Sequence, residues 1–395
     1  MRNVGTVVRG IRTPIIKEND DLEEIVVDSL LRAKESEGFE FRDKDVVAIT
    51  EAVVGISEGN YVTVDDIARD ILKKFPSKRI GLVFPILSRN RFSMILKAIA
   101  RSMDRITIQL SFPADEVGNG ILSEDDLDKS RYSFTSIINE KEYSDTFSSF
   151  VHPFTGINMV DFYRDICSSE NCKVEFIFAN DPRTILSYSR DILVCNIHSR
   201  FYTKRLLEEA GIDSIYCLHD IMNKPVNGSG YNEEYGLLGS NKSTEERLKL
   251  FPRTGDKLVL DIQKKLKEVT GKNIEVMVYG DGAFKDPVGH IWELADPVVS
   301  PAYTKGLEGV PNEIKLKYVS DNKYSNLYGD ELKEAIKEEI KNKDANLKGK
   351  MITQGTTPRH ITDLIGSLCD LTSGSGDKGT PVVFVQGYFD NLADE

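Results

Sequence analysis

The sequence predicts an α/β protein with two domains, one of them inserted into the other. With 395 residues, the chain is long enough for two hydrophobic cores. Apolar runs of strand length alternate with helical patterns through the middle of the chain, which is typical of a mostly parallel sheet. We therefore predict an inserted α/β domain at 81–227, within a discontinuous domain formed by 1–80 and 228–395.

The first 80 residues begin with a strand, a Pro-bearing loop and a helix at 3–34. In this helix, apolar residues recur at helical spacing: Leu22, Ile25, Val26, Leu30 and Leu31. A buried strand at Val46–Thr50 then leads into a Gly-bearing turn, and 64–75 reads as a short amphipathic helix.

The inserted block contains five apolar runs that we expect to be strands: RIGLVFPI, ITIQLSFP, VEFIFAND, DILVCNI and SIYCL. Between them lie helical patterns such as RFSMILKAIARSM and RFYTKRLLEEAG. The block ends near NKPVNGSGYNEEYG at 223–236, a cluster of Gly, Asn, Pro and Ser that is typical of a linker.

The last third alternates helices and strands. We expect a helix at 256–271, a strand at 273–284, a charged helix at 330–350 and a helix at 360–371. The chain then enters TSGSGDKGTPVVFVQG, where three glycines precede a strand of Val and Phe and a fourth follows it. This stretch is either a tight loop before an edge strand or a backbone cradle for phosphate, and the segment alone does not decide. It fits neither the P-loop pattern nor a GxGxxG turn opening a helix.

Composition excludes several classes of protein. The net charge of -12 argues against broad nucleic-acid binding, which requires a basic surface. No apolar run approaches the roughly 18 residues of a membrane span, and no signal-peptide pattern precedes the first predicted strand, so we expect a cytoplasmic protein. The five cysteines include no CxxC pair, which argues against a disulfide framework or a zinc ribbon. Cys195 and Cys217 lie in apolar runs and read as core residues.

Two stretches in the first two thirds of the chain could contact a ligand. Lys17, in the loop Pro14–Lys17, could meet a phosphate as a point charge or remain a solvated lysine. The turn Gly236–Asn241 could approach a ligand closely, or it could be a plain loop before a helix capped by Ser243 or Thr244.

Two further stretches lie near the C-terminus. Asp281 follows a predicted strand and has a glycine on each side, a placement that suits a hard cation such as Mg²⁺. Asp286 is a second ligand or a turn residue before Pro287. The Gly-rich stretch adds Asp377 beside Ser373 and Ser375.

Taken in order, these stretches resemble the coenzyme F420-0:gamma-glutamyl ligase family. The family has Pro-Leu-Ile-Lys before an acidic pair, a strand followed by a Glu-Gly turn, and a loop ending in Ser-Asn. It then has a helix ending in Thr-Gly-Lys, a strand with an Asp-Thr pair, and a Gly-rich loop before a Val-rich strand. The similar segments here are PIIKENDDL, ITEAVVGISEGN, GLLGSN, KEVTGKNIEVMVY, GDG and SGSGDKGTPVVFVQG. The likeness covers about 1–80 and 228–395.

The resemblance implies a homodimeric ligase that joins L-glutamate to an anionic small-molecule acceptor through an acyl phosphate. GTP (or ATP) would be the cosubstrate, with Mg²⁺ or Mn²⁺ as cofactor and without nucleic acid or membrane as partner. The implied catalytic residues are Asp281 and Lys17, and the implied metal ligands are Asp281, Asp377 and Asp286. The implied nucleotide-binding residues are Pro14, Ile15, Ile16, Lys17, Glu51, Asn241, Gly374, Ser375 and Gly376.

The chain departs from the family pattern at several positions. Leu238 stands where the family has a metal-binding Asp, Gly282 replaces a Thr, and Ile56 replaces a nucleotide-binding Lys. Gly374 or Ser375 stands where the Gly-rich loop of the family has a Glu. Two alternatives therefore remain open: a glutamyl ligase for a folate-like or other acceptor, and a non-catalytic nucleotide- or ligand-binding homologue.

The inserted block could select the acceptor. Arg89, Arg91 and Arg183 follow predicted strands, at the sheet edge where α/β proteins bind ligands. They could meet an anionic substrate, or they could cap loops and pair with surface carboxylates.

Overall fold

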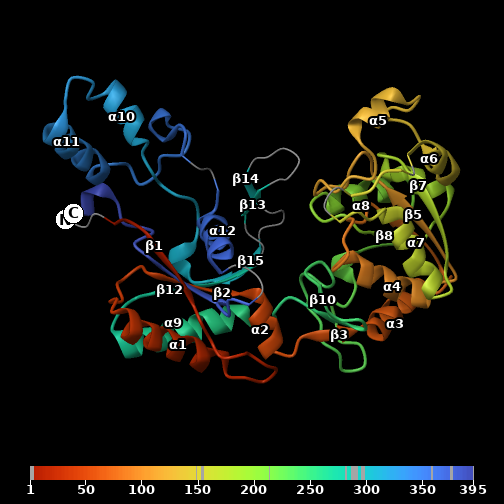
Figure 1. Cartoon of the computed structure of the whole chain (residues 1–395), viewed down its shortest axis with the longest axis horizontal. Coiled ribbons are helices and arrows are strands. Elements are labelled where there is room, and N and C mark those ends of the chain that lie inside the picture. The colour runs from red at the N-terminus through yellow and green to blue at the C-terminus, as the bar shows by residue number, and fades with distance from the viewer. Residues whose placement is uncertain are drawn as a thin grey trace. The chain divides into compact units, whose positions relative to one another are not determined.

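The chain forms a mixed α/β structure made of two units (Figure 1). The terminal unit contains Met1–Ser57 and Thr254–Glu395, and the inner unit contains Glu58–Arg253. The computed structural model describes residues 4–147, 149–152, 155–212, 214–280, 283–285, 292–294, 299–356, 359–373 and 377–394. The segment 81–227 lies wholly within the inner unit, which extends beyond it on both sides.

A five-stranded sheet forms the centre of the terminal unit, in the order β1-β16-β2-β12-β15. These strands are β1 (Val7–Ile11), β16 (Val382–Gln386), β2 (Val46–Thr50), β12 (Glu275–Gly280) and β15 (Val299–Tyr303). β2 and β12 run parallel, and the other neighbours are antiparallel. β16 therefore lies inside the sheet, and the expectation of an edge strand after the Gly-rich stretch is wrong. Both neighbours of β16 lie far away in the sequence. The local residue pattern of a strand does not show which distant strands pair with it.

Helices cover both faces of this sheet (Figure 1). α1 (Leu22–Glu37) and α9 (Gly255–Thr270) pack on one face, against alternate strand residues such as Val47, Val276 and Phe384. α12 (Ile361–Ser373) packs on the other face, against the intervening residues such as Ala48 and Met277. Because both faces are covered, β2 and β16 are apolar almost without interruption.

The helix predictions for this unit hold, with shifted ends. Asp21 accepts a hydrogen bond from the Glu24 N–H at 3.0 Å and starts α1, and Gly38, with φ of 69°, ends it. Residues 51–57 form α2 (Glu51–Ser57) ahead of the predicted turn, because Val54 is buried against the sheet. α10 (Leu316–Asn322) and α11 (Gly329–Lys341) form a small cluster with its own core, and the predicted helix 330–350 stops at Lys341. β13 (Ala283–Lys285) pairs with β14 (Trp292–Leu294).

The inner unit contains a six-stranded sheet in the order β6-β7-β5-β4-β8-β9. The strands are β4 (Arg79–Val83), β5 (Arg105–Leu110), β6 (Ile138–Asn139), β7 (Lys173–Phe178), β8 (Ile192–Val194) and β9 (Ile215–Cys217). Only β6 is antiparallel to its neighbour, which confirms the predicted, mostly parallel sheet. The helices are α3 (Val64–Lys74), α4 (Phe92–Ser102), α5 (Glu124–Lys129), α6 (Glu140–Phe147), α7 (Met159–Ser169) and α8 (Arg200–Glu209).

A three-stranded sheet closes the inner unit where the chain enters and leaves it. β11 (Arg247–Lys249) lies between β3 (Tyr61–Thr63) and β10 (Asn241–Thr244). The N–H of Arg253 donates to Glu58 Oε2 at 2.8 Å, so the first and last residues of the unit meet. The segment after Gly236–Asn241 is thus a strand, and the helix considered there is wrong, because the exposed polar residues of β10 pair with β11.

Asn60 ties the cluster 223–236 into this unit. Its buried side chain donates to the carbonyl oxygens of Tyr231 at 3.0 Å and Phe251 at 2.7 Å, and it accepts from the Tyr231 N–H at 3.0 Å. Gly230 fits here because a Cβ would lie 2.6 Å from the Tyr61 carbonyl oxygen.

Across the described segments, no helix combines the length and apolar character that a bilayer span requires.

We expect Asn60→Ala to destabilise the inner unit by about 2–4 kcal/mol, because it removes three hydrogen bonds to backbone groups of Tyr231 and Phe251. Urea unfolding followed by circular dichroism measures the change. The control Arg69→Ala removes an exposed ion pair with Asp66 in the same unit and should change stability by less than about 0.5 kcal/mol. Equal stability of the two variants would contradict this role of Asn60.

Candidate functional site

Four distant segments meet at one edge of the five-stranded sheet. Ile11 at the end of β1 and Ile49 near the end of β2 both pair with Val382 at the start of β16. β12 ends beside β2, since Tyr279 pairs with Thr50. The loop after β1, the start of α2, the end of β12 and the approach to β16 therefore leave the sheet together.

Backbone hydrogen bonds hold two of these segments to the approach to β16. The Thr13 N–H donates to the Gly379 carbonyl oxygen at 3.2 Å, and the Thr50 N–H donates to that of Pro381 at 2.9 Å. Thr380 Oγ1 donates to the Ser373 carbonyl oxygen at 2.9 Å. The loop Pro14–Lys17 is thus anchored next to the segment that follows the Gly-rich stretch.

The loop Pro14–Lys17 exposes its charge and buries one apolar side chain. Ile16 packs in the core, whereas Pro14 and Ile15 are exposed. The Lys17 N–H donates to Asp20 Oδ2 at 2.7 Å, which fixes the turn into α1. The Lys17 ammonium is exposed and contacts no partner within the described ranges, so it is available to an anion.

Glu51 is buried in the first turn of α2, at the same sheet edge. Its side chain lies against Gly280, where a Cβ would be only 2.6 Å from Glu51 Cγ. Glycine at the end of β12 thus makes the space that Glu51 occupies.

The remaining predicted residues are placed less completely. Asp377 is exposed, two residues before Gly379. Asp281, Asp286, Gly374, Ser375 and Gly376 lie outside the described residues. Asn241 belongs to β10 of the inner unit, where its Oδ1 accepts a hydrogen bond from Arg91 Nε at 3.2 Å.

Of the three arginines considered in the inner unit, one forms an ion pair, and the substrate role of the other two stays a prediction. Arg183 forms an ion pair with Asp181 at 2.7 Å, which confirms the pairing interpretation for this residue. Arg91 contacts Asn241, and Arg89 is exposed.

Sequence analysis missed a cavity of about 790 Å³ in the terminal unit. Strand β1, helix α1 and the residues flanking 374–376 line it: Arg9, Gly10, Ile11, Arg12, Ser29, Arg32, Ala33, Ser36, Glu37, Thr372, Lys378 and Thr380. The sequence does show arginines near the first strand and on the first helix. It does not show that their side chains line the same cavity.

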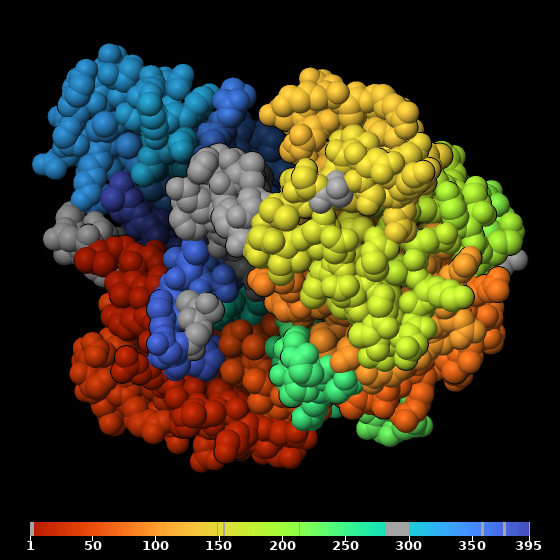
Figure 2. All heavy atoms as spheres, turned by 45° about the vertical axis from the view of Figure 1, so that its right-hand side comes forward, coloured from red at the N-terminus to blue at the C-terminus, as the bar shows by residue number. Residues whose placement is uncertain are grey.

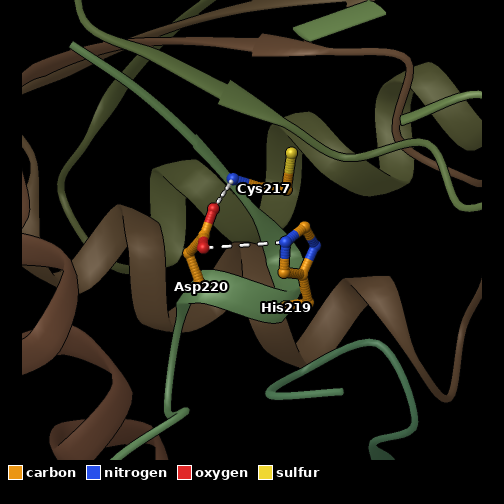
Figure 3. Close-up of side chains that lie close together, drawn as sticks. All are labelled: Cys217, His219 and Asp220. Carbon is orange, nitrogen blue, oxygen red and sulfur yellow. Dashed lines mark hydrogen bonds and ion pairs between the residues drawn. The ribbon is translucent and has the colours of Figure 1, made fainter. Parts of the chain in front are cut away.

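One group of potential metal ligands occurs among the described residues: Cys217, His219 and Asp220, at the end of β9 (Figure 3). Their ligand atoms all lie within 4.8 Å of one another. His219 Nδ1 is buried and, within the described chain, has no hydrogen-bond partner. This atom is the feature that best suits a metal.

The other contacts of the group favour a structural turn. Asp220 Oδ2 accepts from the Cys217 N–H at 2.8 Å, and Lys204 Nζ lies 3.9 Å from the same oxygen. Burial raises the pKa of the Cys217 thiol to about 12, so the thiol is neutral. Burial also lowers the pKa of His219. A lysine beside Asp220, and a carboxylate already hydrogen-bonded to the backbone, make this a poor ligand set for a dication.

Comparison with known proteins gives one finding about the whole chain. A family model described as F420-0:Gamma-glutamyl ligase matches residues 10–387. No match was found among curated proteins. The matched range runs through both units, including 81–227, and contains every residue of the sheet edge described above.

We expect Gly280→Ala to destabilise the terminal unit by about 1–3 kcal/mol, because its Cβ overlaps Glu51. The control Gly366→Ala, in α12, meets no atom closer than 3.6 Å and should be neutral or stabilising by up to about 1 kcal/mol. Urea midpoints of the two variants measure the difference. The close approach of Gly280 and Glu51 is refuted if Gly280→Ala is as stable as the unmodified protein.

We expect none of the five thiols to react with Ellman's reagent at pH 8 in the folded protein, because all five cysteines are buried. Burial raises the pKa of Cys172 to about 11 and that of Cys167 to about 12, so little thiolate exists at this pH. Five thiols should react after denaturation. Rapid reaction of any thiol in the folded protein would show that its surroundings are more open than described.

Proposed function

Because the chain belongs to the F420-0:gamma-glutamyl ligase family, we propose that it joins L-glutamate to a carboxylate acceptor in a nucleotide- and metal-dependent reaction. The family implies a ligase that forms γ-glutamyl bonds, with glutamate and an F420-type acceptor as substrates. The observation that carries the proposal is the family match over residues 10–387.

In the proposed reaction, a carboxylate oxygen of the acceptor attacks the γ-phosphorus of GTP or ATP. The nucleoside diphosphate leaves, and an acyl phosphate forms. The amine of glutamate then attacks the acyl carbon, inorganic phosphate leaves, and the amine loses a proton as the amide forms. Such chemistry depends mainly on positioning the reactants and on neutralising the charge of the transferring phosphoryl group.

The sheet edge supports this proposal through groups that suit an anion. The Lys17 ammonium is exposed, in the loop whose start at Thr13 is anchored to Gly379, and it would contact a phosphate. Pro14, Ile15 and Ile16 would set the shape of this loop, and Glu51 would border the nucleotide from α2. Gly374, Ser375 and Gly376 would offer backbone N–H groups to the phosphates. Asn241, a residue of β10, remains a predicted nucleotide-binding residue.

We propose that carboxylates from the segments near this end of the five-stranded sheet hold a metal ion. Asp377 is exposed near Gly379, and its oxygens are donors that suit Mg²⁺ or Mn²⁺. Asp281, which follows the end of β12, and Asp286 would complete the protein ligands. When bound, the ion would offset negative charge on the phosphate oxygens.

We also propose that the protein forms a homodimer. Light scattering measures its mass in solution and tests this.

A second candidate function is a homologue that binds nucleotide without turnover. Two positions where the family has polar ligands hold residues packed into cores. Leu238 packs against the main core of the inner unit, and Ile56 packs against the core between α1 and the sheet. Neither side chain can serve a metal or a phosphate. A glutamyl ligase with a folate-like or other acceptor is the third possibility.

The test incubates the protein with GTP or ATP, Mg²⁺ or Mn²⁺, glutamate and a panel of carboxylate acceptors. We expect a product heavier by one glutamyl unit, and phosphate release that requires metal, glutamate and acceptor. Asp281→Ala and Lys17→Ala should each lower turnover by about 10²-fold or more. The control Asp28→Asn removes an exposed carboxylate from α1 and should have no effect.

Each outcome assigns a function. Nucleotide binding without phosphate release for any acceptor would favour the non-catalytic homologue. A product with a folate-like acceptor alone would identify the third possibility. Unchanged turnover in Asp281→Ala would remove this residue from the metal site.

A further inference from the structure

The cavity of the terminal unit gathers basic side chains from both ends of the chain. Arg9 and Arg12 come from β1 and the loop after it, Arg32 from α1, and Lys378 from the segment before β16. Figure 2 shows the N-terminal residues and the segment around 372–380 side by side on one face of the molecule. Among the described residues that line the cavity, Glu37 is the one carboxylate.

None of these four cations has a carboxylate partner within the described residues, and Arg9 among them has close contacts of another kind. Arg12 and Lys378 are exposed and form no hydrogen bond or ion pair there. Arg32 contacts only Ser29 Oγ, at 3.4 Å. Arg9 differs, because it donates to Gln386 Oε1 at 2.7 Å and lies 4.7 Å from the ring centre of Phe39. A chain with a net charge of -12 thus leaves three cations unpaired around one cavity.

Three of the four hydroxyl groups that line the cavity in the described residues donate to backbone oxygens, and the fourth, that of Ser29, accepts from Arg32. Thr372 Oγ1 donates to the Leu368 carbonyl at 2.7 Å, Thr380 Oγ1 to that of Ser373 at 2.9 Å, and Ser36 Oγ to that of Ala33 at 3.2 Å. Their hydrogens are therefore not free for a ligand. The donors that remain are mostly cationic, which favours an anion over a neutral polyol.

We propose that this cavity binds the oligophosphate group of a small molecule through Arg12, Arg32 and Lys378. Guanidinium groups form paired hydrogen bonds with phosphate oxygens, and Lys378 adds a point charge. Arg12 and Arg32 lie outside the motifs that carry the family resemblance, whereas Lys378 lies within the Gly-rich one. The identity of the ligand rests on the proposed function: it is the nucleotide or a phosphate-bearing acceptor. Binding of the anion itself does not depend on turnover.

Calorimetric titration of the full chain with sodium tripolyphosphate at low ionic strength tests the site. We expect the double variant Arg12→Gln/Arg32→Gln to bind about tenfold more weakly, and Lys378→Gln to bind a few-fold more weakly. Glu37→Gln should bind more tightly, because it removes the opposing charge. The matched control Lys34→Gln lies on the same helix, is paired with Glu40 at 2.8 Å, and should leave affinity unchanged. Raised salt should weaken binding.

The proposal is overturned if the unmodified protein does not bind tripolyphosphate. It is also overturned if the double variant binds as the unmodified protein does, or if Lys34→Gln weakens binding equally. Because all these side chains reach solvent, thermal melts should show that the variants fold.

Competition separates the two sources of the ligand. Displacement of tripolyphosphate by GTP would assign the site to the nucleotide. Displacement by a phosphate-bearing acceptor, with GTP ineffective, would assign it to the acceptor. Tripolyphosphate binding without any glutamyl product would refute the proposed function and leave the anion site standing.

Discussion

The terminal unit depends on the insertion of β16 between β1 and β2. This strand is wholly buried and pairs on both sides, so the last segment of the chain joins two strands formed near its beginning. Without β16, β1 would have no neighbour in the sheet, and the faces under α1 and α12 would lose their central row of side chains. The sheet edge that carries Lys17 and Glu51, and the cavity beside it, are consequences of this pairing.

The sequence allowed most elements to be predicted, because their signals are local. Helical spacing in α1 and α9, and apolar runs in β4, β5 and β8, need no knowledge of distant residues. The order of the strands in a sheet does depend on distant residues. The sequence of β16, for example, fits an edge strand and an interior strand equally well. The strand that contains Asn241 could not be predicted for the same reason. β10 has few apolar residues and forms by pairing with β11.

The candidate site was predictable in part for a related reason. Motifs identified Lys17 and Asp377 as residues at segment ends, and sheet pairing brings these segments to one edge. The basic cavity could not be found in this way, because Arg12, Arg32 and Lys378 share no motif and meet only after folding. Leu238 and Ile56, where the resemblance implies polar ligands, pack against apolar cores. Any activity of this chain has to be compatible both with its family and with apolar side chains at these two positions.

The contact between Glu58 and Arg253 has a consequence for the history and engineering of the chain. Because the inner unit starts and finishes at one spot, with β3 and β11 paired beside it, the polypeptide leaves and re-enters the terminal unit across a short gap. A gene fragment encoding such a module can be gained, lost or exchanged while the flanking halves still find each other. A short peptide joining residue 57 to residue 254 would therefore give an uninterrupted terminal unit.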